Sequence, residues 1–289
     1  MCKKLNKKMG VFIMENINVN EKVSPNKERR QSFAKVANER LGEAVVQKCG
    51  ELAFIAEYVN SQDITIQFKK TGERVKTTYN NFVIGNIKSH FTPTVYGVGI
   101  TGVEPTEDEN GELINSYICW VNMLKRCYSY KYQEKYPTYK GCSVCNEWLY
   151  YPNFKNWYDE NYYEIDGKIL QLDKDILIKG NKVYSPDICV FVPNFINSLF
   201  TKRQNDRGEL PIGVCYNKRD KKYVAQLSIF KDGKSTKKYL GYYNTADEAF
   251  EVYKQAKEDY IKEVADEYKD IIPVKLYEAM YEYEVNIND

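Results

Sequence analysis

Residues 211–260, PIGVCYNKRDKKYVAQLSIFKDGKSTKKYLGYYNTADEAFEVYKQAKEDY, carry the clearest structural pattern in the chain. Three β-rich runs, at 211–216, 222–231 and 236–243, are separated by short polar segments that contain Asn, Asp or Gly, residues that favour tight turns. Next, Thr245-Ala246-Asp247-Glu248 places a Glu three residues after a Thr, which is the capping-box pattern of a helix start. The stretch therefore predicts three antiparallel strands packed against one helix. The helix face expected to pack on the sheet consists of Ala249, Phe250, Tyr253, Ala256 and Tyr260.

The ionisable residues are distributed unevenly along the chain. In total, 42 Lys and Arg stand against 40 Asp and Glu, for a net charge of +2. Residues 201–243 hold eleven basic and four acidic residues and 1–40 hold ten and four, whereas 244–289 hold five and 13. A basic block inside a near-neutral chain is typical of a DNA-binding segment, although a solvated basic face without a partner gives the same count. Charge alone leaves both interpretations open.

Composition excludes several classes of protein. The chain has 289 residues, 43% of them hydrophobic, so we expect packed domains rather than wholesale disorder. No run approaches the roughly 20 apolar residues of a membrane span, and the apolar run at 9–14 is too short for a signal-peptide core. We therefore expect a cytoplasmic protein without membrane partners, whose eight cysteines are reduced. The single histidine, His90, excludes multi-histidine metal sites, and it excludes a Ser-His-Asp triad unless His90 itself serves.

The rest of the chain predicts an α+β fold in several modules. The runs Ala53–Tyr58 and Asp63–Phe68 are strand-like, and 77–87 is expected to add a further strand or two, which together favour a small β-barrel. In the centre, 116–130 predicts a helix and 170–193 predicts strand, loop and strand. The expected domains are a basic arm at 1–35, a small β-barrel-like module at 36–92, a central domain at 93–205, a sheet-plus-helix domain at 206–268 and an acidic C-terminal helix at 269–289.

Further expectations concern the helices and the C-terminal segment. In the central helix the apolar residues recur at three-residue steps, and Asn194 is placed to cap the helix that follows the last central strand. The acidic C-terminal segment is either a solvated face or a surface that docks a protein partner or mimics DNA. Two apolar sets are expected to pack: Ile118, Val121, Leu124 and Cys127 in the central helix, and Tyr277, Met280, Tyr281 and Val285 near the C-terminus.

The C-terminal third resembles a known DNA-binding family. The motifs Gly213-Val214, Tyr223-Val224-Ala225-Gln226 and Leu240-Gly241-Tyr242-Tyr243-Asn244-Thr245-Ala246-Asp247-Glu248-Ala249 are similar to the ethylene-response-factor (AP-two/ERF-type) DNA-binding domain, over about 208–268. Phage and bacterial relatives of that domain accompany mobile nucleases. The resemblance implies that the sheet enters the major groove of double-stranded DNA and contacts it with basic and aromatic side chains.

The basic hairpins supply the candidate DNA contacts. Lys and Arg neutralise phosphates, and Arg219 and Gln226 are suited to bidentate contacts with base edges. Tyr216 and Tyr223 are expected to stack or to pack. A solvated basic sheet without a partner remains the alternative. The candidate nucleic-acid-binding residues are Lys218, Arg219, Lys221, Lys222, Tyr223, Gln226, Lys231, Lys234, Lys237 and Lys238.

The centre of the chain resembles a second family. Three motifs, Trp120-Val121-Asn122-Met123-Leu124-Lys125-Arg126-Cys127-Tyr128, Val144-Cys145-Asn146-Glu147-Trp148 and Tyr184-Ser185-Pro186-Asp187-Ile188-Cys189, are similar to phage HNH homing endonucleases, over about 117–200. The resemblance implies a hairpin and a helix around one divalent metal, with a histidine as general base and an asparagine that orients the site. It also implies a setting in a phage-infected bacterial cell.

The sequence departs from that family at the positions that carry the chemistry. The base position falls at or next to Lys174, and Ile188 replaces the asparagine that precedes the cysteine. Asp173 and Asp175 are candidate Mg²⁺ ligands, which strand alternation would place on one face with Lys174 on the other. A solvated turn is the alternative for this pair. The candidate catalytic residues are Asp173, Lys174, Asp175 and Asn181.

The cysteines offer a different kind of metal site. Cys142-Ser143-Val144-Cys145 has the spacing of a zinc knuckle, and Cys127 and Cys189 could complete four thiolates. A second close pair is lacking, so we favour buried, reduced cysteines and do not expect zinc.

Two classes of function follow from these patterns. The first is a phage-type protein that recognises double-stranded DNA and is related to HNH homing endonucleases, with metal-dependent nicking left open because the motif lacks its histidine. The second is a catalytically inactive, nuclease-derived interaction protein, such as a phage counter-defence factor.

Overall fold

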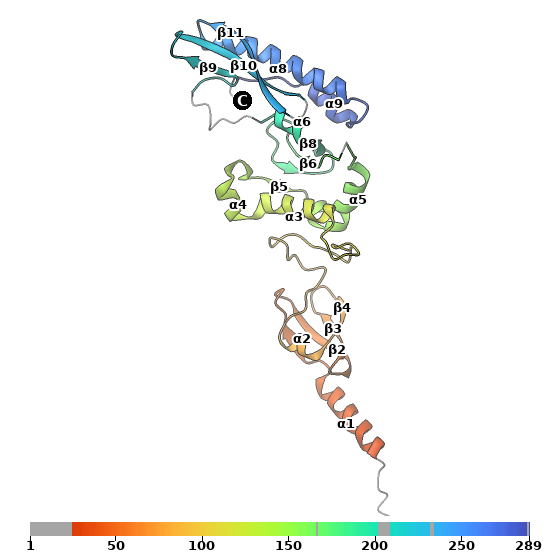
Figure 1. Ribbon diagram of the computed structural model, residues 1–289. Helices are drawn as coiled ribbons and strands as arrows, with labels where there is room; N and C mark the ends of the chain where they lie inside the picture. The colour runs from red at the N-terminus through yellow and green to blue at the C-terminus, as the bar shows by residue number, and fades with distance from the viewer. Residues whose placement is uncertain (1–24, 166, 202–208, 232–233, 288) are drawn as a thin grey trace, which may run out of the picture. The chain divides into compact units, whose positions relative to one another are not determined.

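The computed structural model describes residues 25–165, 167–201, 209–231, 234–287 and 289. The chain forms two compact units, with the boundary in the sequence between Ser89 and His90 (Figure 1). Most of the expected basic arm lies outside the described residues. From Pro25 onward that arm belongs to helix α1 (Pro25–Arg40).

The first unit is built on a four-stranded antiparallel sheet in the order β1-β2-β3-β4. Alternation along β3 places the side chains of Ile64, Ile66 and Phe68 in the core, together with Ala53 and Ile55 of β2. The strands are β1 (Ala44–Val46), β2 (Leu52–Asn60), β3 (Asp63–Phe68) and β4 (Arg74–Thr77).

The expectation for residues 77–87 is wrong. After β4 the chain forms helix α2 (Tyr79–Val83), which begins at Thr78, whose hydroxyl accepts a hydrogen bond from the Asn81 backbone N–H at 3.3 Å. Phe82 of α2 is fully buried against the sheet. In the described residues β1 and β4 are the two edges of this sheet, so the module is an open sheet with a helix and not a closed barrel.

The second unit begins with the aromatic-rich central segment. Two short sheets form there: β5 pairs with β7 in parallel and β6 pairs with β8 antiparallel. The elements are α3 (Asn115–Tyr128), α4 (Tyr130–Lys135), the 3₁₀ turn η1 (Pro137–Tyr139), β5 (Ser143–Val144), the 3₁₀ turn η2 (Asn146–Leu149), α5 (Tyr151–Asn161), β6 (Leu170–Asp173), β7 (Val183–Tyr184), β8 (Val190–Pro193) and α6 (Asn194–Leu199).

Two local expectations for this segment need correction. The buried face of α3 contains Trp120, Met123 and Leu124, whereas Ile118 is 40% exposed. Of the expected set, Leu124 and Cys127 are buried and Val121 packs against the same core, so only Ile118 is wrong. It departs from the buried face because three-residue steps drift around a helix with 3.6 residues per turn. Asn194 does not cap α6 but is its first residue, because β8 runs directly into the helix and Pro193 takes the N-cap position.

The C-terminal sheet and helix form as predicted. The sheet is antiparallel in the order β11-β10-β9, and helix α8 follows β11 (Figure 1). The capping box is confirmed: the Thr245 hydroxyl accepts from the Glu248 N–H, and the Glu248 carboxylate accepts from the Thr245 N–H, both at 3.2 Å. The elements are β9 (Val214–Asn217), β10 (Lys222–Lys231), β11 (Lys234–Tyr243), α8 (Ala246–Tyr268) and α9 (Val274–Tyr281).

Helix α8 connects two parts of the second unit. Its first half packs on the sheet through Ala249, Phe250 and Tyr253, whereas Ile261 and Val264 of its second half pack in a cluster with α6, β8 and α9. No helix among the described residues is long and apolar enough to cross a membrane.

Candidate functional site

One face of the C-terminal sheet is left uncovered by helix α8. Ala225, Leu227 and Ile229 of β10 point towards α8 and belong to the core that contains Phe250. Because side chains alternate along a strand, the even-numbered residues of β10 point the other way. Residues directly opposite each other on two paired strands have their side chains on the same face. The register between β10 and β11 therefore also shows which residues of β11 lie on that face. We call the resulting surface the open sheet face; it carries Lys222, Gln226, Lys237, Tyr239 and Tyr242.

The hairpin turn at one end of this face holds three more of the predicted residues. Asn217 shapes the turn, since its side-chain oxygen accepts hydrogen bonds from the backbone N–H groups of Arg219 and Asp220. Lys221 has a φ of 50°, the left-handed conformation that a tight turn requires. Lys218, Arg219 and Lys221 are all exposed, and Arg219 makes one loose contact, at 3.5 Å, with Asp220. This end of the sheet therefore presents three cationic side chains to solvent.

The structure separates the remaining predicted residues by face. Gln226, Lys222 and Lys237 lie on the open sheet face. Lys238 is opposite Leu227, and Tyr223 belongs to the core under the sheet, so both point to the side of α8. Tyr216 lies opposite Tyr223, with their ring centroids 5.1 Å apart, and is on that side too. The side chains of Lys231 and Lys234 lie outside the described residues.

Two aromatic residues of the open sheet face were missed by sequence reasoning. Tyr239 is 68% exposed and Tyr242 is 58% exposed, values that are high for tyrosines in a sheet. Simple alternation from the partly buried side chain of Leu240 places Tyr239 on the open face but places Tyr242 on the side of α8. A register shift opposite Ala225 and Gln226 leaves Leu240 without a partner, which brings Tyr239 and Tyr242 to the same face. The bulge, which no sequence motif predicts, places Tyr242 on the same face as Tyr239 and Gln226.

The acidic C-terminal segment does not lie on the open sheet face. Val285 packs in the core on the α8 side of the sheet, and its N–H donates to the Glu258 carboxylate at 2.8 Å. Met280 is fully buried in the other cluster, whereas Tyr281 stays 38% exposed and donates its hydroxyl to Asp266 at 2.7 Å. The expected apolar stripe is thus correct for Met280, Val285 and the partly buried Tyr277, which packs beside Met280, and wrong for Tyr281. The segment packs on its own unit and leaves the cationic face accessible.

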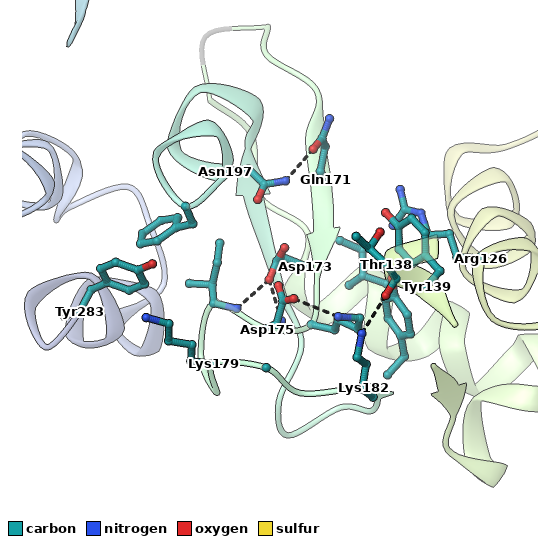
Figure 2. A pocket seen from close by; sticks show the side chains of 16 residues that line it. Arg126, Thr138, Tyr139, Gln171, Asp173, Asp175, Lys179, Lys182, Asn197 and Tyr283 are labelled. Carbon is teal, nitrogen blue, oxygen red and sulfur yellow. Dashed lines mark hydrogen bonds and ion pairs between the residues drawn. The ribbon is translucent and has the colours of Figure 1, made fainter. Parts of the chain in front are cut away.

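A second group of predicted residues surrounds a polar cavity of about 370 Å³ (Figure 2). Asp173 and Asp175 lie at its centre, with Lys179 and Tyr283 on one side and Arg126, Tyr139 and Lys182 on the other. Among the described lining residues there are four basic side chains and two acidic ones. We call it the polar cavity.

The geometry of the two aspartates differs from the expected strand alternation. Strand β6 ends at Asp173, and the chain then turns, because the Asp173 Oδ1 accepts hydrogen bonds from the backbone N–H groups of Asp175 and Ile176, both at 2.8 Å. Lys174 is only 7% exposed, and its Nζ lies 3.0 Å from Asp175 Oδ2 and 2.9 Å from the Asn181 carbonyl oxygen. The lysine therefore pairs with an aspartate and does not point to the opposite face.

These contacts determine what the polar cavity can bind. Burial and, to a smaller extent, the charge of the neighbouring Asp175 together raise the pKa of the Asp173 carboxyl to about 6. A divalent cation would need charged oxygen ligands, but Asp175 is paired with an ammonium group and Asp173 already accepts two backbone hydrogen bonds. In the described part of the chain, no three His, Cys, Asp or Glu side chains are grouped so that they could hold a metal ion. The residues present do not fit a Mg²⁺ site.

The other candidate catalytic residues take structural positions. Asn181 donates its side-chain N–H groups to the carbonyl oxygens of Lys174 and Val183, at 2.7 and 2.6 Å, and so holds the loop after β6. It is not among the residues that line the polar cavity, and neither is His90. Arg126, Lys182 and Asn197 line the cavity and were not singled out from the sequence, because they come from α3, the loop before β7 and α6, which only the tertiary fold brings together.

The cysteines are free thiols in the described residues. Burial raises the pKa of Cys127 and of Cys189 to about 12, so these side chains are neutral near pH 7. Cys127, Cys142 and Cys189 are buried in or beside the aromatic core of Trp120 and Trp148. The four-thiolate zinc arrangement is not assembled among the described residues.

Comparison with protein-family models, with curated proteins and with solved structures found no match for this chain.

Proposed function

We propose that this protein binds double-stranded DNA through the open sheet face. The observation that carries the proposal is the separation of the two faces of the sheet. Helix α8 and the acidic C-terminal segment pack on one face, while lysines, a glutamine and two exposed tyrosines gather on the other. Lysines at such positions neutralise phosphates and displace counterions, and a glutamine can contact adenine with both ends of its amide.

The electrostatics of the hairpin support the same function. Lys218 and Lys221 are exposed and make no ion pair or hydrogen bond with another described residue. Lys222 donates to the Asn244 side chain, a neutral partner that leaves its charge uncompensated. Cationic groups that the chain does not neutralise are the ones available to a polyanion.

The test is a duplex-binding titration over a range of salt concentrations. Lys221→Ala combined with Lys222→Ala should weaken binding about tenfold at low salt and reduce the slope of log affinity against log salt by about 2. Lys254→Ala combined with Lys269→Ala removes the same charge from α8 and its C-terminal end, and should leave the slope close to that of the original protein. Equal slopes for the two double variants would contradict the proposal.

A second candidate differs in class: a nuclease-derived scaffold that binds DNA or a host or phage protein without hydrolysing a phosphodiester. The ion pair between Lys174 and Asp175 favours it, because it occupies the position where the resemblance to HNH enzymes implies a base and a metal ligand. Supercoiled plasmid incubated with Mg²⁺ or Mn²⁺ should then remain intact. Nicking that disappears in both Asp173→Ala and Asp175→Ala would instead establish a metal-dependent endonuclease.

A further inference from the structure

A buried lysine of helix α8 has no partner within the described chain. Lys257 is 8% exposed, and no ion pair or hydrogen bond joins it to another described residue. Placing an ammonium group out of water without a counter-charge is costly, and such groups in proteins are normally paired. Burial accordingly lowers the pKa of Lys257 to about 8, and no neighbouring charge opposes the effect. Within the described part of the chain, the charge of this lysine therefore forms no stabilising interaction.

Lys257 lines a cavity of about 1140 Å³, which we call the lysine cavity. Strand β9 pairs only with the beginning of β10, from Lys222 to Ala225, so the rest of that edge of β10 faces the cavity. Helix α6 closes another side, where the ring of Phe195 stacks on that of Phe230 at 6.1 Å. Apolar side chains make much of the wall; they include Phe195, Leu199, Ile212, Leu227 and Ile229.

The charge of the lysine cavity has one sign. Lys168, Lys237 and Lys257 line it, and none of its described lining residues is an aspartate or glutamate. The Nζ of Lys168 lies 4.6 Å from the centre of the Phe195 ring, so a second cation stands directly beside the apolar wall. Cavities with apolar walls and a few convergent polar groups are typical of small-molecule sites, and this one is large enough for a drug-sized ligand.

We propose that the lysine cavity binds a small amphipathic anion, a molecule with a carboxylate, sulfonate or phosphate group held by Lys257 and an apolar or aromatic body held by the wall of β10 and α6. The shape supplies room for the body, and the three lysines supply the only formal charges of the described lining. An acidic group beside Lys257 provides the counter-charge that the described residues lack. The lysine cavity shares Gln226 and Lys237 with the open sheet face, but Lys257 and the apolar wall lie outside that face, so the proposal does not depend on DNA binding.

The experiment compares two fluorescent probes that differ chiefly in charge. The full-length protein is titrated with 8-anilinonaphthalene-1-sulfonate, which carries a sulfonate, and with N-phenyl-1-naphthylamine, which lacks it. The sulfonate probe should bind with a blue-shifted, enhanced emission, and Lys257→Met should weaken its affinity at least tenfold while changing that of the neutral probe less than twofold. Lys254→Met, one turn earlier on α8 and outside the cavity lining, should alter neither.

Two competitors then distinguish the sources of such an anion. Displacement of the sulfonate probe by decanoate identifies an aliphatic carboxylate, and displacement by adenosine monophosphate identifies a nucleotide. The proposal is overturned if the sulfonate probe does not bind, if Lys257→Met weakens both probes equally, or if neither competitor displaces the probe.

Discussion

Two buried lysines of the second unit have nearly the same exposure and opposite surroundings. Lys174, in the polar cavity, is 7% exposed and contacts both the Asp175 carboxylate and the Asn181 carbonyl oxygen. Lys257, in the lysine cavity, is 8% exposed and has no such contact among the described residues. The described residues compensate the charge of the first lysine but not that of the second. A buried charge with internal partners recovers part of its desolvation cost, whereas one without them bears that cost in full unless a bound counter-charge offsets it.

The largest expected effect comes from changing the wall of the lysine cavity. Gly213 lines that cavity with a φ of 77°, and a Cβ at this position would lie 2.1 Å from a ring carbon of Tyr253. Because Tyr253 is buried between the sheet and α8, it cannot move aside without disturbing the core. Gly213→Ala should therefore lower the free energy of unfolding by about 3 kcal/mol or more, as measured by urea denaturation.

A matched glycine separates the steric clash from the backbone conformation. Gly111 has a φ of 80°, but a Cβ there would meet nothing within 4 Å. Gly111→Ala should cost only about 1 kcal/mol, the penalty for a left-handed alanine. Similar losses for the two variants would show that the contact between Gly213 and Tyr253 does not hold the sheet on its helix.

Removing the paired lysine should be destabilising. Lys174→Met keeps most of the volume but leaves the Asn181 carbonyl oxygen without its donor and Asp175 without its counter-ion. We expect a loss of about 2 kcal/mol in the free energy of unfolding, because a broken buried contact costs more than the intact contact contributes. An unchanged or increased stability would mean that the contacts of Lys174 do not offset the cost of burying its charge. The two lysines would then not differ in the way proposed.

Removing the unpaired lysine should have the opposite sign. Lys257→Met replaces a costly ammonium with an apolar side chain and should raise the free energy of unfolding at pH 7 by about 2 kcal/mol, while abolishing binding of the anionic probe. A variant that is more stable but does not bind is the behaviour expected of a ligand site. A loss of stability would indicate a structural role for Lys257.

The pH dependence of that difference sharpens the test. The unfolded lysine keeps its ordinary pKa of 10.5, whereas burial lowers the pKa of the folded one to about 8. Between these values the unfolded state holds more protons, so the original protein gains stability relative to Lys257→Met as the pH rises from about 8 to about 10. Urea denaturation of both proteins at pH 7, 8.5 and 9.5 should show their difference shrinking. A constant difference would mean that Lys257 titrates at its ordinary pKa.

Local patterns made the C-terminal part of the fold predictable. The capping box at Thr245 needs only four adjacent residues, and the helix face at Phe250 and Tyr253 follows from spacing along one element. The segment 77–87 was misread because its β-branched residues suit a strand, while the Thr78 cap and the burial of Phe82 select a short helix. Local preference failed where a tertiary contact outweighed it.

The sites were less predictable than the fold for a related reason. The sequence located the cationic hairpin correctly, because Lys218, Arg219 and Lys221 are adjacent in the chain and stay together on a turn. It could not assign the residues of the open sheet face, since the bulge at Leu240 sets the register of Tyr242. The sequence also did not predict that Lys257 is buried. In the sequence it is one of several charges on an amphipathic helix, and only the tertiary fold brings α6 and β10 around it.

The smallest expected effect distinguishes two adjacent lysines of β11. Lys237 lies opposite Ser228 on the open sheet face, and Lys238 lies opposite Leu227 on the side of α8; both are exposed. If DNA lies on the open sheet face, Lys237→Ala should weaken duplex binding about fivefold at low salt, and Lys238→Ala should weaken it less than twofold. The two variants remove the same charge one residue apart, so long-range electrostatics changes their duplex affinities almost equally. A difference between the two affinities therefore reports on which face of the sheet contacts the DNA. Fluorescence anisotropy with a labelled duplex measures both, and equal losses would place the DNA elsewhere on the basic hairpin.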